Sequence, residues 1–227
     1  MDRLFRIRLL IGDDGVQKLQ NATVMVVGCG AVGSFAIEAL ARSGVGHLVL
    51  VDFDSVERTN INRQLFALES TIGMPKVDVA VARVRDINPD IDVIAMNMFF
   101  DAATRPGTIP DFVIDAIDSV QSKVALYKWC DENKIPFISS MGAARKVDPA
   151  GITVARISQT HACPLAARVR KQIRGLGISD FPVVYSPERP VPQLTPGKEF
   201  GSIITVTGAF GLTLANFVIN HVINQGG

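Results

Sequence analysis

Short apolar runs alternate with segments of helical periodicity through the first 140 residues of the chain. The apolar runs are nearly continuous, which is typical of strands buried on both faces of a parallel sheet. The strands that they predict span residues 23–27, 47–54, 91–96, 112–116 and 136–140. The helices predicted by the remaining periodicity span residues 3–19, 31–42, 76–87 and 120–133. This alternation predicts an α/β fold, with a doubly wound, Rossmann-like and mostly parallel sheet and right-handed crossovers.

The chain after residue 140 is less regular, but no linker or internal repeat separates a second domain. It contains an apolar stretch at 152–157, a basic helix at 164–174, a proline-rich loop at 186–192 and an apolar segment at 201–222. We therefore predict one domain over residues 1–227. Its parts are N-terminal helices (1–22), a nucleotide-binding half (23–140) and a substrate and dimer half (141–227).

The apolar segment at 201–222 contains no Asp, Glu, Lys or Arg. Its length is close to the ~20 residues that span a bilayer. However, serine, threonine, asparagine and histidine residues interrupt it, and no cluster of lysine or arginine flanks it. We therefore predict a buried C-terminal helix and no membrane span.

Composition and charge limit the classes of protein to which the chain can belong. The chain has 227 residues, 48% of them hydrophobic and 20% charged, which fits a well-buried globular protein. The formal net charge of +1 provides no global field toward nucleic acid or membrane. The cysteines, Cys29, Cys130 and Cys163, form no C-x-x-C pair, so neither zinc nor a disulfide framework is expected. The N-terminus has no apolar signal core, and we expect a cytoplasmic protein.

A glycine motif follows the first predicted strand. Gly28, Gly30 and Gly33 match G-x-G-x-x-G, in which the glycines allow a tight turn, phosphate approach and close packing of helix on strand. Asp52 follows Gly33 by 19 positions, near the ~20 expected for an acid that binds ribose. Taken alone, these residues favour a dinucleotide such as NAD.

Three later residues change that interpretation. Arg63 and Lys76 follow the second strand, and Asp118 follows the strand at 112–116, so all can reach the carboxyl edge of the sheet. Two cations there would neutralise a triphosphate and a leaving pyrophosphate. A carboxylate among phosphates usually implies Mg²⁺. The alternatives are solvated surface charge for the cations and a helix N-cap for Asp118.

These residues resemble the ubiquitin-activating-like adenylating family from about Leu4 to His221. The resemblance implies ATP and Mg²⁺ as cofactors, catalytic Arg63, Lys76 and Asp118, and Asp118 as the metal ligand. It also implies a homodimer, because Arg6, in an R-x-x-x-x-x-G pattern ending at Gly12, would reach the partner's ATP site. The nucleotide-binding set that we predict is Gly28, Gly30, Gly33, Asp52, Asp54, Asn60, Arg63, Gln64 and Lys76.

The second half resembles one branch of that family, the tRNA threonylcarbamoyladenosine dehydratases, in the segments at 139–149, 158–161, 164–166 and 185–188. This resemblance implies that the substrate is tRNA carrying threonylcarbamoyladenosine. Its carboxylate would be activated as an acyl-adenylate, and its own ureido group would close a hydantoin ring and release AMP. Intramolecular closure benefits from a high effective molarity and needs no transfer cysteine. Cys163 is still a candidate thiol, because related activators carry reactive thiols in this segment.

Other functions stay open at this point. The chain could activate a sulfur-carrier or ubiquitin-like protein, although it lacks the paired C-x-x-C motifs of many such activators. An NAD(P)-dependent oxidoreductase and a catalytically silent nucleotide-binding scaffold are further alternatives.

Cationic residues in the second half could contact tRNA phosphates. Arg168, Lys171 and Arg174 recur along one face of the predicted helix at 164–174, and Arg145 and Lys146 precede it. An ordinary solvated helix face is the alternative interpretation. No aromatic-rich RNA motif is present, so the tRNA hypothesis depends on the resemblance.

Overall fold

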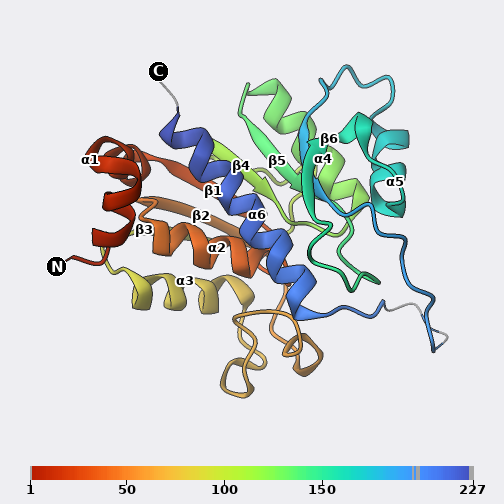
Figure 1. Cartoon of the computed structure of the whole chain (residues 1–227), viewed down its shortest axis with the longest axis horizontal. Coiled ribbons are helices and arrows are strands. Elements are labelled where there is room, and N and C mark those ends of the chain that lie inside the picture. Colours follow the sequence, from red (N-terminus) through yellow and green to blue (C-terminus); the bar gives the residue numbers. More distant parts are fainter. Residues whose placement is uncertain (1, 196, 198–199, 225–227) are drawn as a thin grey trace.

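A computed structural model describes residues 2–195, 197 and 200–224 of the chain. Met1 and residues 225–227, which the predicted domain includes, lie outside the described residues. The fold has three layers, in which helices cover both faces of a central sheet (Figure 1). The strands are β1 (Thr23–Val27), β2 (His47–Asp52), β3 (Asp92–Asn97), β4 (Phe112–Asp115), β5 (Phe137–Ser140), β6 (Thr153–Arg156) and β7 (Pro182–Tyr185). The α-helices are α1 (Phe5–Asn21), α2 (Gly33–Ser43), α3 (Lys76–Ile87), α4 (Val120–Glu132), α5 (Pro164–Ile173) and α6 (Ile204–Ile223).

The strand order is β3-β2-β1-β4-β5-β7-β6. Every neighbouring pair is parallel except β6 and β7, which are antiparallel. The predicted doubly wound, mostly parallel sheet is therefore confirmed. The order reverses between β1 and β4, and such a switch point leaves a crevice at the carboxyl ends of the strands.

The continuous apolar pattern of the strands follows from burial on both faces. In β1, Val24 and Val26 belong to the core beneath α2, α3 and α6. Met25 and Val27 face the opposite way and pack with Leu126 of α4. Alternate side chains thus enter two separate cores, so the strand has no polar position.

Helix α6 is the buried C-terminal helix that the sequence predicts. Phe210 and Leu214 are fully buried in the main core, and α6 lies diagonally across α2 and the sheet (Figure 1). At Gly211 a Cβ atom would lie 2.3 Å from the Val32 carbonyl oxygen, so only glycine allows this approach to α2. The helix is long and apolar enough to cross a membrane by composition, but half of its apolar window is buried within the fold.

Several element boundaries differ from the prediction. Helix α2 begins at Gly33 and not at residue 31, because residues 30–32 form the turn ahead of it. Strand β2 ends at Asp52, whose carboxylate accepts the backbone N–H of Asp54 and turns the chain. Helix α1 is kinked at Gly12, where φ is +73°. Strand β7 and its pairing with β6 are not predicted by the pattern at all.

Candidate active site

A pocket of about 910 Å³ opens at the switch point of the sheet. Its walls come from the chain segments after β1, β2, β4 and β5, together with residues 57–64, the start of α3 and part of the second half. All of the predicted nucleotide-binding residues except Gly33 line it, and Asp118 lines it as well. The volume lies within the range of small-molecule sites, about 300–1,000 Å³.

The glycine turn is required by close backbone contacts. Gly28 has φ +97°, and a Cβ there would lie 2.7 Å from the Ala116 carbonyl oxygen. Gly33 packs behind the turn and not in the pocket wall. Because of this packing, a Cβ on Gly33 would lie 1.7 Å from the Gly28 carbonyl oxygen, so only glycine fits here. Gly30 lines the pocket, and a Cβ there would meet only the Gln64 amide, at 3.7 Å. Val32, the N-cap of α2, lines the pocket, and no side chain caps the helix there, so this helix N-terminus is suited to a phosphate.

Asp52 is fixed at the base of the pocket. Its Oδ2 accepts the Cys29 N–H at 2.6 Å, and its Oδ1 accepts the Asp54 N–H at 2.9 Å. These bonds tie the end of β2 to the glycine turn and orient the carboxylate. A fixed carboxylate at this position can accept ribose hydroxyl groups.

Asn60 and Gln64 are both buried in the pocket wall. The Asn60 side chain accepts the Glu57 N–H at 3.1 Å, and the Gln64 N–H donates to the Asn60 carbonyl at 2.9 Å. The short helix Arg58–Asn60 thus holds the two amides in one compact turn. The family resemblance implied that both residues belong to the nucleotide site, and this turn explains how both come to line the same pocket.

Lys76 and Asp54 form an ion pair at the pocket edge. Lys76 is the first residue of α3, and its Nζ lies 2.8 Å from Asp54 Oδ2. The lysine side chain is 10% exposed, so the ammonium is held in place by its surroundings. Asp54 can therefore act by orienting Lys76, while Lys76 presents a positive charge to bound phosphate.

Arg63 lies half-buried on the same side of the pocket. Its Nη1 donates to the Thr59 carbonyl at 2.7 Å and to Asn62 Oδ1 at 2.9 Å. Asn62 in turn donates to the Ser202 carbonyl at 3.0 Å, which connects this segment to the chain before α6. The arginine is thus positioned by both halves of the molecule.

Asp118 is exposed in the loop between β4 and α4. The backbone ahead of it is fixed, because Asp115 Oδ1 accepts the Ile117 N–H at 3.0 Å. Ser119, and not Asp118, caps α4 by accepting the Ser122 N–H. The capping alternative for Asp118 is therefore wrong, and its carboxylate is available to the pocket.

A buried charged network lies directly behind this loop, and sequence reasoning missed it. Lys123 donates to Asp115 Oδ2 and to the Ser140 carbonyl, each at 2.8 Å, and both charged side chains are fully buried. Tyr127 and Ser139 donate to the same Asp115 oxygen at 2.8 and 2.5 Å. Burial, together with the Asp115 carboxylate, raises the pKa of Tyr127 and keeps it a neutral donor. The available signal was the i, i+4 spacing of Lys123 and Tyr127 on one face of α4.

Arg6 does not reach the pocket within one chain. It lies exposed on α1, on the segment before the kink at Gly12. The structure of a single chain thus leaves the predicted contact with a partner's ATP site as a prediction. Leu9 and Leu10 on the same helix are 68% and 83% exposed.

The predicted basic surface is only partly available. Arg168 is exposed and lines the pocket. Lys146 is not a surface cation: it is 2% exposed and donates to the carbonyls of Ser186 and Glu188, and burial lowers its pKa. The loop carbonyls bind its ammonium group internally, so Lys146 is not part of an exposed cationic surface, and its contact with tRNA phosphates stays a prediction.

The carboxylates of the pocket would hold a metal ion only together with the phosphates of a bound nucleotide. Among residues 2–195, 197 and 200–224, no three His, Cys, Asp or Glu side chains group closely enough to hold an ion. Mg²⁺ commonly binds through one or two carboxylates plus substrate phosphates. The exposed Asp118, in the lining of this pocket, fits that arrangement.

Comparison with known proteins identifies the family. A model described as the ThiF family matches residues 2–226. The chain belongs to the ThiF family. The tRNA threonylcarbamoyladenosine dehydratase of Bacillus subtilis (strain 168) is 50% identical over 190 residues, which cover 82% of this chain and 75% of that protein. The resemblance predicted from the residues is thereby confirmed.

Solved structures of a related enzyme match the whole ThiF fold. E. coli tRNA N6-threonylcarbamoyladenosine dehydratase in complex with ATP has a TM-score of 0.91 and 34% identity, covering 98% of this chain and 94% of that one. The same enzyme in complex with AMP has a TM-score of 0.92 with the same identity and coverage.

Proposed function

We propose that this protein is an ATP-dependent enzyme that cyclises threonylcarbamoyladenosine in tRNA. One observation carries the proposal: the pocket at the switch point brings together Asp52, Arg63, Lys76 and Asp118, the residues expected to bind ATP and Mg²⁺. The chain that forms this pocket is 50% identical to a tRNA threonylcarbamoyladenosine dehydratase. The threonyl carboxylate attacks the α-phosphate of ATP, and pyrophosphate leaves. The ureido nitrogen of the same substrate then attacks the acyl carbon, the ring closes and AMP leaves. The modified base has lost one water.

The residues of the pocket divide this work. Asp52, fixed by two backbone N–H groups, binds the ribose. Lys76 and Arg63 stabilise the charge that grows on the phosphates as pyrophosphate leaves. Because both cations are held by neighbouring side chains or carbonyls, little reorganisation is needed when ATP binds. The E. coli structures solved with ATP and with AMP support a nucleotide site of this kind.

Asp118 would hold Mg²⁺ together with the phosphates. The ion, when bound, neutralises part of the phosphate charge. The support for this role is the exposure of the carboxylate in the pocket and the fixed turn that carries it.

Ring closure needs no protein nucleophile. When the ureido nitrogen and the activated carbonyl belong to one substrate, the reaction is intramolecular and has a high effective molarity. The cysteines fit this scheme. Burial raises the pKa of both Cys29 and Cys130, which keeps them as unreactive thiols. Cys163 is buried outside the active-site lining.

We also infer a homodimer in which Arg6 reaches the partner's pocket. The support is the position of Arg6 on an exposed helix outside its own pocket, beside the exposed Leu9 and Leu10. Sedimentation should give twice the chain mass for the wild type and one chain for Leu10→Glu. A monomeric, fully active wild type would contradict the inference.

The test of the function is a mass assay. Protein, ATP, Mg²⁺ and tRNA bearing threonylcarbamoyladenosine should yield AMP, pyrophosphate and a base lighter by one water. Asp118→Asn should lower kcat by about 10²-fold or more, as for loss of one electrostatic stabiliser. Asp86→Asn, on the exposed side of α3, is the matched control and should keep full activity. A wild-type protein that binds ATP but leaves the base mass unchanged refutes the proposal.

A further inference from the structure

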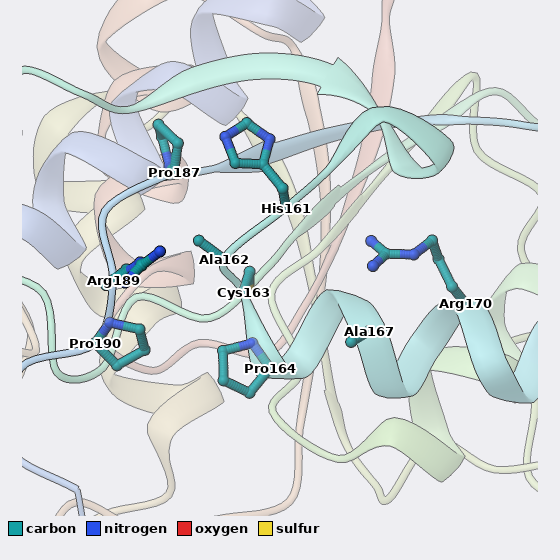
Figure 2. A pocket seen from close by; sticks show the side chains of 9 residues that line it. All are labelled: His161, Ala162, Cys163, Pro164, Ala167, Arg170, Pro187, Arg189 and Pro190. Carbon is teal, nitrogen blue, oxygen red and sulfur yellow. The ribbon is translucent and has the colours of Figure 1, made fainter.

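A second pocket, of about 670 Å³, lies beside the active site (Figure 2). We call it the flanking pocket. The side chains that give it its chemistry are basic or apolar. The basic ones are His161, Arg170 and Arg189, and the prolines Pro164, Pro187 and Pro190 add apolar rings. Among the residues that the structure describes, no aspartate or glutamate contributes to its lining. It opens to solvent, since His161, Pro164 and Arg189 are exposed.

The flanking pocket adjoins the active site. Pro164 and Pro190 line both pockets, so the two pockets are adjacent and one polynucleotide can occupy both. Figure 2 shows Arg189 and Pro190 on one chain segment, opposite Cys163 and Pro164 at the start of α5. These two segments lie far apart in the sequence, so no local sequence motif predicts the flanking pocket.

The walls of the flanking pocket are held in place. Next to Arg189, the Glu188 carboxylate accepts the Val147 N–H at 3.0 Å, which anchors this loop to the segment after β5. On the other wall, His161 Nδ1 lies 3.4 Å from the buried Tyr185 hydroxyl, and the two rings meet edge to face. Pocket walls held in this way favour binding, because less side-chain freedom is lost when a ligand enters.

The two arginines differ in availability. Arg170 donates to the Thr160 carbonyl at 3.0 Å and is partly buried, so it contributes positive potential more than direct contact. Within the described part of the chain, Arg189 has no ion-pair or hydrogen-bond partner, and Figure 2 shows it among the side chains that surround the pocket. A guanidinium that pairs with no described side chain, at a pocket whose described lining holds no carboxylate, is suited to phosphate.

We propose that the flanking pocket binds the nucleotide next to the modified adenosine in the RNA strand. Arg189 contacts its phosphate, and the base stacks on the His161 ring, as unstacked RNA bases commonly do on aromatic side chains. The prolines provide apolar contact for the sugar. This assignment rests on the proposed function, since only a polynucleotide substrate continues past the activated residue. A carrier-protein tail would place its one terminal carboxylate in the active site, so it would bring neither a phosphate nor a planar base to the flanking pocket.

The experiment compares Arg189→Gln with Arg85→Gln, which removes the same charge from the exposed side of α3. Both are assayed on tRNA bearing threonylcarbamoyladenosine. For Arg189→Gln we expect the KM for tRNA to rise about tenfold, as for loss of one charged hydrogen bond. The KM for ATP should be unchanged, and the salt dependence of tRNA binding should weaken by about one phosphate contact. Arg85→Gln should behave as the wild type.

The outcomes separate the two proposals. If the wild type forms no cyclic base, the proposed function fails, and the flanking pocket loses its assigned ligand with it. If the wild type is active and Arg189→Gln keeps the wild-type KM and salt dependence, the flanking-pocket assignment is overturned while the function stands. An equal rise in the KM for tRNA and in the KM for ATP for Arg189→Gln would also overturn the assignment. So would a variant whose only defect is in the pyrophosphate exchange that a carrier protein ending in Gly-Gly stimulates.

Discussion

Replacing Lys123 by methionine tests whether the buried network behind the active-site loop holds the fold together. Lys123 and Asp115 are both fully buried and 2.8 Å apart. Methionine has a similar length, so packing is largely kept. The change leaves the Asp115 carboxylate without its counter-charge, and it removes the Lys123 donor from the Ser140 carbonyl, which keeps the longer bond from the Ser139 hydroxyl at 3.5 Å.

The magnitude follows from the contacts that survive. Removing one partner of a buried ion pair costs about 3–5 kcal/mol. Tyr127 and Ser139 still donate to Asp115, so we expect the lower end, about 3 kcal/mol. For a chain of this size that corresponds to a fall in Tm of about 6–12 °C. It is also a large share of a typical stability of about 5–15 kcal/mol.

Urea unfolding followed by circular dichroism measures this loss. Lys128→Met on the exposed side of the same helix is the control and should change stability by less than about 0.5 kcal/mol. The double variant Asp115→Asn with Lys123→Met should recover part of the loss, because no charge is then buried alone. A loss below about 1 kcal/mol for Lys123→Met would refute the reasoning, since the pair would then contribute no more than an exposed one.

Three further predictions concern other parts of the fold. Gly33→Ala should reduce both stability and ATP affinity in calorimetry, because its Cβ would lie 1.7 Å from a backbone carbonyl oxygen of the turn, and unchanged ATP binding would contradict this. Burial raises the pKa of Glu38, but hydrogen bonds from Arg83 and Arg42 lower it more, and the net pKa lies below the ordinary value. Its stabilisation is present above about pH 4.3 and lost as the pH falls through the lower folded pKa, so Glu38→Gln should flatten the acid limb of stability; an unchanged limb would contradict this. Burial raises the pKa of Cys130, so iodoacetamide should label it only after unfolding, and rapid native labelling would exclude the assigned burial.

The parallel core could be predicted from sequence because its strands are buried on both faces. Such strands give continuous apolar runs, as at β1 and β4, and the turn after β1 carries a glycine pattern that few other structures need. Strand β7 could not be predicted in the same way. It has four residues, begins with a proline and depends on pairing with β5, some 40 residues earlier, and with β6.

The residues that line the candidate site could be predicted from the sequence better than the residues that hold them in position. Local motifs indicated Asp52, Lys76 and Asp118, because their positions after strands fix the edge that they share. The partner of Lys146 could not be inferred, since the carbonyls that bind it belong to a loop 40 residues away. Side chains that position other side chains, such as Lys123, give only a weak signal in the local sequence, because their effect depends on tertiary contacts.

The position of α6 in the fold has a consequence for how the protein is made. Phe210, Leu214 and Val218 of α6 complete the core that covers one face of the sheet at β1 and β4. Synthesis reaches α6 only after all seven strands have been made. Until then the apolar surface of α2 that α6 covers is open to water, so the nucleotide-binding half has no finished core of its own. Nascent chains that stop before residue 204 should therefore depend on chaperones and remain sensitive to proteases.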